Sequence, residues 1–506
     1  MPSDDQSRKT VAVSAPGKVL LAGGYLVLDR DYTGLVFGLD ARIHVHIRPL
    51  HTSTGVVLEE IIVKSPQFKD AIWEYGYRRS EKDGGVLVHP LTSSAQQTLH
   101  PNPFVETTLT HVLTYISTKL ASATNPSPTI HPSAITILAD DAYYTTPSNK
   151  STEFTGEQFK FFGIPLWDAH KTGLGSSAAL VTALTAALLA HYLPEEKLLT
   201  TEEGRLRVHN LAQVAHCVAQ GKVGSGFDVA SAVYGSCIYR RFSPSVIAMT
   251  DSPGTAGYAS RLRALVDDDE AIAEDKEEGE GQRKKWDTQI TKAGAALPKG
   301  LRLVMCDVDC GSKTPGMVKG VLDWRKREPE EAGMVWTKLH AQNEAVQAEL
   351  QHLCQADAKA EFSGRFDKLS AALADVRASV RNMSRLSGVP IEPESQRALL
   401  DGCLGVTGVV NGVVPGAGGY DAVALLIEDT PETLEELRKF LERWNTSVAA
   451  EQAQLAKASG VEWEEAPGLV SVLEVKQDDE GVRVEKGAMY ASWVLRREES
   501  NDDYEP

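Results

Sequence analysis

The chain has 506 residues, of which 42% are hydrophobic and 24% charged, a composition typical of a globular protein. This length exceeds the roughly 250–300 residues at which a single core stops growing, so two domains are expected. The formal net charge of −17 argues against nucleic acid as the main partner, because phosphate backbones are bound by clustered Lys and Arg. It does not exclude nucleotides, which a few positive groups and backbone N–H donors can hold.

The cysteines and the N-terminus predict a cytosolic protein. The most apolar long segment, Ala178–Leu193, has 16 residues, fewer than the ~20 that span a bilayer, and the N-terminus lacks the apolar core of a signal peptide. The close pair in CDVDC has no second pair or histidine cluster to complete a zinc site, so we interpret it as structural. The six cysteines are too sparse for a disulfide scaffold, which predicts reduced thiols at Cys217, Cys237, Cys306, Cys310, Cys354 and Cys403.

The first elements in chain order are two predicted strands, TVAVSAP and LVFGLDARIHVHIRPL. Residues of the second strand alternate at period two, which places His44 and His46 on one face. Two histidines on one face could bind a metal, but without a third ligand we interpret them as part of a solvent-facing strand surface. A helix is predicted in PFVETTLTHVLTYISTKLA and a strand in AITILADDAYY, with the proline-rich loop ATNPSPTIHPS between them.

The acidic segment Asp267–Lys285, which is almost devoid of apolar residues, predicts a solvated, mobile insertion near a domain boundary. After it, GLRLVMCDVD predicts a buried strand, and amphipathic helices are expected between Pro329 and Leu400. DAVALLIED is a further predicted strand, and PETLEELRKFLERWNTSV a further helix. These patterns suggest domains at 1–245 and 299–506, joined by a linker at 246–298 and with strand exchange between the domains as an option.

The stretch KTGLGSSAALVTALTAALLAHYL places glycines and serines before a run of small apolar residues. Gly173 and Gly175 permit unusual backbone dihedrals and the close approach of a ligand. Ser176 and Ser177 are strong N-cap types, and the run behind them predicts a helix that ends before the next proline. The first turn of such a helix offers unpaired N–H groups and a positive dipole end to a phosphate. On this stretch alone, an ordinary capped core helix remains the alternative.

Two other nucleotide motifs fit this stretch poorly. A Walker motif needs a lysine after its last glycine, where this chain has serines. The spacing of Gly173, Gly175 and Ala178 matches a dinucleotide fingerprint, and Glu195 lies about 20 residues further on. That fingerprint must follow a hydrophobic strand, whereas PLWDAHKT is polar. The sequence therefore disfavours an NAD-dependent enzyme.

Three further stretches, together with GLGSSAA, carry a family resemblance. SAPGKVLLAGGYLVLD places Lys18 in a Pro-Gly turn after a strand, and AHCVAQGKVGSGFDVASAVYG places Asp228 at the start of a helix after a flexible loop. GVVPGAGGYDAVALL is a second glycine-rich loop that enters a strand. In this order they resemble the superfamily of galactokinase, homoserine kinase, mevalonate kinase and phosphomevalonate kinase. Along nearly the whole chain, the sequence is most similar to the eukaryotic, fungal-type phosphomevalonate kinases.

The resemblance implies an α+β fold of two domains with the site between them. The N-terminal domain would resemble domain 2 of ribosomal protein S5, with a left-handed βαβ crossover against the usual rule, and the C-terminal domain would be ferredoxin-like. The implied reaction transfers the γ-phosphoryl group of ATP to (R)-5-phosphomevalonate, with Mg²⁺, on the route to isoprenoids and sterols. Mevalonate kinase or another small-molecule kinase of the superfamily is the alternative. A non-catalytic nucleotide-binding module is disfavoured because Lys18 and Asp228 are both present.

The resemblance also implies roles for single residues. Lys18 would neutralise charge between the phosphoryl donor and acceptor, and Ser176 or Ser177 would offer a hydroxyl to Mg²⁺. The predicted partners are ATP and 5-phosphomevalonate, without nucleic acid or membrane, in a monomer or alternatively a homodimer. The residues assigned to ATP are Gly173, Leu174, Gly175, Ser176, Ser177, Ala178 and Asn102, and those of the supporting loop are Gly416, Gly418 and Gly419.

Asp228 is expected to orient Lys18 and the acceptor rather than to act as a base. The acceptor phosphate has a second pKa of ~6 and is mostly dianionic at cytosolic pH, so a base is largely dispensable. A carboxylate with only a structural role at a helix N-terminus is the alternative. Arg240 and Arg241 are interpreted as strand-face charges. Candidate contacts to the acceptor are Lys222 and Lys313 for its phosphate, and Tyr25, Ser225 and Ser312 for its carboxylate or hydroxyl.

Overall fold

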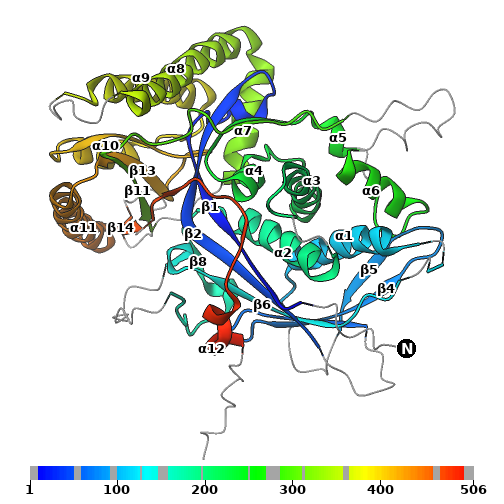
Figure 1. The fold of residues 1–506 in the computed structure, drawn as a ribbon. Helices are drawn as coiled ribbons and strands as arrows, with labels where there is room; N and C mark the ends of the chain where they lie inside the picture. The colour runs from blue at the N-terminus through cyan, green and yellow to red at the C-terminus, as the bar shows by residue number, and fades with distance from the viewer. Residues whose placement is uncertain are drawn as a thin grey trace, which may run out of the picture.

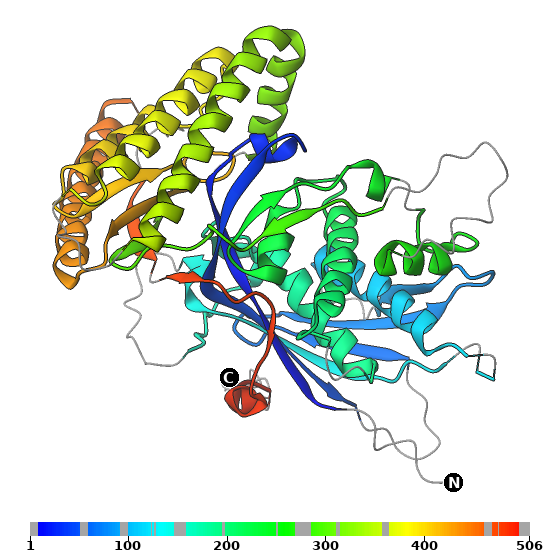
Figure 2. The same cartoon turned by 45° about the horizontal axis from the view of Figure 1, so that its top comes forward.

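The structure is a computed structural model and shows two lobes with a shared centre (Figures 1 and 2). Long strands from the N-terminal part of the chain run through that centre, where they touch both lobes. The residues that it describes are 9–50, 59–91, 100–122, 124–125, 128–145, 158–194, 198–248, 251–268, 285–309, 314–356, 364–459, 468–473 and 475–494.

The N-terminal lobe is built on a mostly antiparallel sheet in the order β10-β9-β2-β6-β3-β4-β5, with β1 paired to β2. The two strands predicted near the N-terminus are confirmed, and both are longer than expected. The strands are β1 (Val11–Ala22), β2 (Thr33–Pro49), β3 (Glu60–Lys64), β4 (Ile72–Arg79), β5 (Val86–Pro90), β6 (Ser133–Ala139), β9 (Cys237–Arg240) and β10 (Gln289–Thr291).

Helices cover one face of this sheet (Figure 1). The helix α2 packs on β1 and β2 and against its helical neighbours, and its residues are apolar nearly all round, as expected for a buried helix. Among the described residues, no helix combines the length and the apolar character needed to cross a membrane. The helices of this lobe are α1 (Pro103–Leu120), α2 (Ser176–Tyr192), α3 (Glu202–Ala219), α4 (Phe227–Tyr234), α5 (Ser245–Ala248) and α6 (Tyr258–Asp267).

The C-terminal lobe has an antiparallel sheet in the order β12-β13-β11-β14. Alternate residues of β11 face opposite sides: Val304 packs with α10 and α11, and Leu303 belongs to the core shared with α8 and α9. The predicted strands and helices of this region are confirmed as β11 (Leu301–Val308), α8 (Pro329–Gln355), α9 (Asp367–Ser387), α10 (Glu394–Leu404), β13 (Ala422–Glu428) and α11 (Pro431–Ser459). The sequence analysis did not predict α7 (Thr314–Arg327), β12 (Val409–Val413) or β14 (Val470–Leu473).

The end of the described chain returns to the N-terminal lobe along β1 and β2 (Figure 2). β15 (Gln477–Asp478) pairs with β2, and β16 (Arg483–Val484) pairs with β1. The buried Arg42 guanidinium fastens this segment, because it donates hydrogen bonds to Asp478 Oδ2 at 2.8 Å and to the Gly481 carbonyl at 2.6 Å. After β16 the segment ends in a 3₁₀ turn at Gly487–Tyr490 and in α12 (Ala491–Val494).

This returning segment overturns the interpretation of His44 and His46. Their side chains are only 1% and 6% exposed, so they do not form a solvent-facing strand surface. The hydroxyl of Tyr490 lies 2.9 Å from His44 Nδ1, and Asp140 Oδ1 lies 3.2 Å from His44 Nε2. The strand period correctly predicted a shared face, but it contains no information about a segment more than 400 residues away that covers it.

The cysteines and the acidic segment are seen only in part. Cys217, Cys237, Cys306 and Cys403 are buried free thiols and Cys354 is an exposed one. Cys310, Glu195 and residues 269–284 of the acidic segment lie outside the described residues.

The predicted strand AITILADDAYY ends at Ala139. It is followed by a 3₁₀ turn at Asp141–Tyr143 and by β7 (Tyr144–Thr145), which pairs with β8 (His170–Lys171).

Candidate active site

The loop before α2 has a left-handed backbone at two glycines. Gly173 has φ +72° and Gly175 has φ +84°, a region that favours residues without a Cβ. Gly175 is the N-cap of α2, so the predicted capping by Ser176 or Ser177 is wrong; the left-handed turn brings both serines into the first turn itself. No side chain among the described residues caps this end, which leaves N–H groups of the first turn as donors for an anion.

Lys18, in β1, is hydrogen-bonded to this loop. The predicted Pro-Gly turn is wrong, because the strand continues through Pro16 and Gly17 with only a register shift between them. The Lys18 backbone N–H donates to the Leu174 carbonyl at 2.9 Å, and Lys18 Nζ donates to the Gly173 carbonyl at 3.1 Å. The strand thereby positions one cation directly beside the loop.

Asp228 approaches the same cation from α4. That helix begins after Gly226, which has φ +83°, and Asp228 Oδ1 accepts a hydrogen bond from the Val229 N–H at 2.9 Å. Lys18 Nζ lies 5.8 Å from the centre of the Phe227 ring. Burial lowers the pKa of the Lys18 ammonium, and the Asp228 carboxylate opposes that shift. The predicted position of Asp228 at a helix start is confirmed.

A buried histidine that the sequence analysis missed lies between the two helix N-termini. His216 of α3 is 3% exposed, and its Nε2 lies 3.1 Å from Ser177 Oγ and 3.9 Å from Asp228 Oδ2. It therefore lies between Ser177, to which it is hydrogen-bonded in the loop at Gly173–Ala178 (the phosphate loop), and Asp228, which is beyond hydrogen-bond distance. Nothing in the stretch AHCVAQGKVGSGFDVA distinguishes this residue from a core histidine, since its role depends on contacts between three helices.

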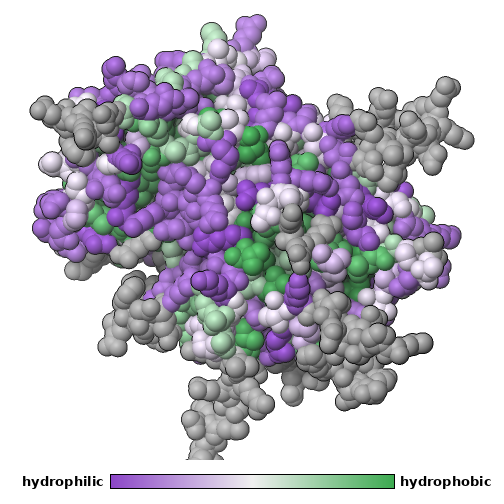
Figure 3. Space-filling view, viewed as in Figure 1, coloured by the Kyte–Doolittle hydropathy of each residue, from purple (hydrophilic) through white to green (hydrophobic). Residues whose placement is uncertain are grey.

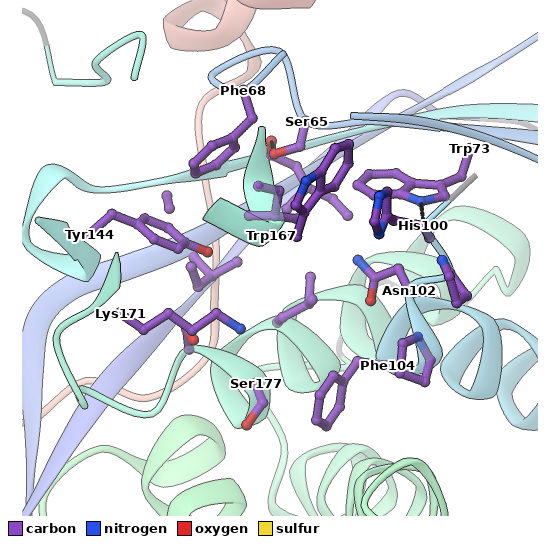
Figure 4. A pocket seen from close by; sticks show the side chains of 18 residues that line it. Ser65, Phe68, Trp73, His100, Asn102, Phe104, Tyr144, Trp167, Lys171 and Ser177 are labelled. Carbon is purple, nitrogen blue, oxygen red and sulfur yellow. Dashed lines mark hydrogen bonds between the residues drawn. The ribbon is translucent and has the colours of Figure 1, made fainter. Parts of the chain in front are cut away.

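A cavity of about 230 Å³ opens beside Ser176 and Ser177 (Figure 4). The stacked rings of His100 and Trp167, with centroids 3.8 Å apart, form part of its wall. Hydrophobic residues also gather on the outer surface over α1 and α2 of the N-terminal lobe (Figure 3). The other aromatic residues that line the cavity are Phe68, Trp73, Phe104 and Tyr144.

Two polar side chains extend into this cavity. Asn102 is the N-cap of α1, where its Oδ1 accepts a hydrogen bond from the Val105 N–H at 3.3 Å, and its amide nitrogen points into the cavity (Figure 4). Lys171, which the sequence analysis missed, points in from β8, and desolvation by the cavity walls lowers the pKa of its ammonium group. A basic residue two positions before a phosphate loop was a signal that could have been used.

Comparison with known proteins identifies the family. Residues 163–236 match the family model for the GHMP kinases N terminal domain. Over 486 residues, 96% of the chain, the sequence is 48% identical to the phosphomevalonate kinase of Gibberella zeae, of which 99% is covered. The phosphomevalonate kinase of Aspergillus fumigatus is 44% identical over 510 residues, which cover 96% of the chain and 98% of that protein. The chain belongs to the phosphomevalonate kinase family.

Solved structures confirm the fold expected for this family. A Lin0012 protein from Listeria innocua has a TM-score of 0.60 at 16% identity and covers 95% of this chain and 100% of its own. The Streptococcus pneumoniae phosphomevalonate kinase in complex with phosphomevalonate and AMPPNP has a TM-score of 0.53 at 15% identity, covering 85% and 95%. The two-domain α+β architecture predicted from the sequence is therefore shown.

The second glycine-rich loop of this family member packs against the N-terminal lobe. It leads into β13, as predicted, and follows β12, and Tyr25 Oη donates to the Ala417 carbonyl at 2.6 Å. A Cβ at Gly24 would lie 2.6 Å from the Gly416 carbonyl oxygen, and one at Gly418 would lie 2.2 Å from that of Ile391. Close backbone contacts therefore explain these glycines, and the Tyr25 hydroxyl is engaged with the loop.

A buried arginine is hydrogen-bonded to the backbone of the loop before α4. Arg241 is 8% exposed and donates to the carbonyls of Val223 at 3.1 Å and Gly224 at 2.6 Å. Its interpretation as a strand-face charge is wrong, because the chain leaves β9 at Arg240 and turns the next guanidinium inward, where backbone carbonyls accept hydrogen bonds from both of its terminal nitrogens. Arg240 itself does lie in the strand.

Only some of the residues predicted to bind the acceptor substrate lie in the described part of the chain. Lys222 is exposed on the loop before α4, and the Ser225 carbonyl accepts a hydrogen bond from Tyr239 Oη at 2.8 Å. Both residues shortly precede Asp228 in the chain. Ser312 and Lys313 lie outside the described residues.

The oxygen donors beside the loop fit a magnesium ion. The Ser177 hydroxyl and the Asp228 carboxylate both neighbour His216 and are ligand types that Mg²⁺ prefers, whereas thiols are lacking among them. Among the described residues, no group of three or more His, Cys, Asp or Glu could hold a metal by itself. Mg²⁺ in nucleotide sites takes one or two protein ligands and otherwise binds phosphates and water.

Proposed function

We propose that this chain transfers the γ-phosphoryl group of ATP to (R)-5-phosphomevalonate and releases (R)-5-diphosphomevalonate and ADP, a step toward isoprenoids and sterols. The observation that carries the proposal is the 48% identity to a phosphomevalonate kinase over nearly the whole of both chains. The arrangement of Lys18, the phosphate loop and Asp228 supports it, because phosphoryl transfer requires mainly positioning and charge neutralisation. A cytosolic location and a monomer are also proposed.

ATP would lie across the cavity and the phosphate loop. The base fits between the aromatic residues of the cavity, and the amide nitrogen of Asn102 is a donor for it. The β- and γ-phosphates would bind the N–H groups at Gly173–Ala178, where the dipole of α2 stabilises negative charge. Lys171 would add a second positive charge near the phosphates.

The acceptor would lie on the other side of Lys18, near the loop before α4. Its phosphate oxygen attacks the γ-phosphorus while Lys18 reduces the repulsion between the two anions. Asp228 orients Lys18 and does not need to remove a proton from the acceptor phosphate, because that phosphate is already ionised. Mg²⁺, bound through Ser176 or Ser177, would neutralise charge on the β- and γ-phosphates. The remaining acceptor contacts are proposed for Tyr25, Lys222, Ser225, Ser312 and Lys313.

An ADP-release assay with two acceptors tests the proposed reaction. We expect kcat/KM for 5-phosphomevalonate to exceed that for mevalonate by about a hundredfold or more, since a site built for a charged group rejects the analogue that lacks it. Equal or faster turnover of mevalonate would contradict the proposal and favour the mevalonate kinase reaction.

Replacing Asp228 with asparagine should lower kcat by about a hundredfold at every pH from 6 to 9, since a small displacement of Lys18 is enough to cause such a loss. If Asp228 were instead a general base, raising the pH would ionise the acceptor and restore the rate of the variant. Parallel pH profiles of wild type and D228N therefore support an orienting role. Full recovery at pH 9 would rule it out.

Replacing Trp167 with alanine should raise KM for ATP about tenfold with little change in kcat, because stacking of a base on an aromatic ring contributes ~1–3 kcal/mol. Phe161 provides the matched control: it lies on the same segment, is 51% exposed and does not line the cavity. F161A should leave KM for ATP unchanged. Equal effects of the two substitutions would place the base elsewhere.

A further inference from the structure

His216 lies where three helices meet, with its ring side chain almost fully buried. Its ring stacks on Phe104 of α1, with centroids 5.7 Å apart and an interplanar angle of 30°. Two polar groups lie close to its Nε2: Ser177 Oγ from the first turn of α2 at 3.1 Å, and Gln220 Nε2 from the C-terminal end of α3 at 3.3 Å. Asp228 Oδ2 of α4 is further away, at 3.9 Å.

The partners of this nitrogen determine the direction of the hydrogen bond with Ser177. The amide nitrogen of Gln220 can only donate, so the His216 Nε2 that it faces acts as an acceptor. The Ser177 hydroxyl, which can donate or accept, then donates its hydrogen to the same nitrogen, whose single lone pair the two donors share, with the serine at the shorter distance. Asp228 does not compete for it, because 3.9 Å exceeds hydrogen-bond distance.

A hydroxyl whose hydrogen is committed in this way presents only lone pairs to the nucleotide side. Such an oxygen can bind a cation, whereas it has no hydrogen left to donate to a phosphate. We propose that His216 is a positioning residue that holds the Ser177 hydroxyl as a magnesium-facing acceptor. The proposal rests on the function proposed above and assigns Ser177, rather than Ser176, to the metal.

The metal dependence of nucleotide binding tests this role. Binding of AMPPNP is measured calorimetrically with Mg²⁺ and with EDTA for the full chain and for His216→Phe and His216→Gln. Phenylalanine retains a ring that can stack on Phe104 but lacks the acceptor, whereas the glutamine amide oxygen can accept the Ser177 hydrogen. Mg²⁺ should increase the AMPPNP affinity of H216F about ten- to a hundredfold less than it increases that of wild type, while the affinity in EDTA stays unchanged. For H216Q, the increase in affinity should stay within about threefold of the wild-type increase.

A second readout does not depend on a variant that folds. Nitrogen-15 NMR of the nucleotide-free wild-type chain should show His216 with its hydrogen on Nδ1 and with Nε2 as an acceptor. A hydrogen on Nε2 would overturn the proposal, as would a Mg²⁺ effect in H216F equal to that of wild type. These results are separable from the function itself: if wild type fails to bind AMPPNP or to phosphorylate 5-phosphomevalonate, the proposed function fails first.

Discussion

Replacing Lys18 with methionine should lower kcat by about a thousandfold while the protein remains folded. The Lys18 ammonium is held beside the phosphate loop by the Gly173 carbonyl and lies close to Asp228. Loss of one preorganised charge-stabilising group costs about 10²–10³ in rate, and this group faces both the donor and the acceptor phosphate. Single-turnover kinetics with saturating ATP measures the effect.

Lys338 provides the control for this substitution. It is exposed on α8, away from the loop, so K338M should retain wild-type kcat. K18R should recover little activity, because the planar guanidinium is bulkier than an ammonium and Gly175 already packs against the Lys18 side chain. A K18M enzyme with more than about a tenth of wild-type kcat would remove Lys18 from the catalytic machinery.

Replacing Gly175 with alanine should lower activity by about a hundredfold and the free energy of unfolding by about 1–2 kcal/mol. The stability loss follows from φ +84°, a left-handed conformation that a Cβ disfavours. The activity loss has a different cause: the new Cβ would lie 2.9 Å from Lys18 Cε and would displace the ammonium group. Chemical denaturation and steady-state kinetics measure the two effects separately.

Gly388 separates backbone strain from displacement of the lysine. It has φ +70° at the C-cap of α9, and a Cβ there would meet nothing within 4 Å. G388A should therefore lose a similar amount of stability and keep wild-type kcat. If G175A were as active as G388A, the close packing of the loop on Lys18 would have no role in catalysis.

The elements that the sequence predicts well are those whose causes are local. The apolar run of α2 and the strands at Leu301–Val308 and Ala422–Glu428 follow from hydrophobic patterns within one element. The position of Asp228 follows from the glycines just before it. The errors at His44 and His46 have another cause, since the segment that covers them lies more than 400 residues away in the chain. The error at Arg241 arises because β9 ends one residue before it, at Arg240.

The site could be predicted as motifs but not as a set of contacts. The glycine-serine loop, Lys18 and Asp228 are recognisable in the sequence, and the structure brings them together. The aromatic cavity and His216 were missed, because ordinary core residues acquire these roles only where several elements meet. The N-cap of α2 was predicted at the serines, whereas the left-handed backbone at Gly175 makes that glycine the N-cap.

A crystal structure with AMPPNP, Mg²⁺ and 5-phosphomevalonate tests directly where the triphosphate binds. We expect the β- and γ-phosphates to lie against the N–H groups of Gly173–Ala178, with Lys18 Nζ between the γ-phosphate and the acceptor phosphate. Triphosphate density elsewhere, with no ligand at that bend, would show that the proposed phosphate site is wrong.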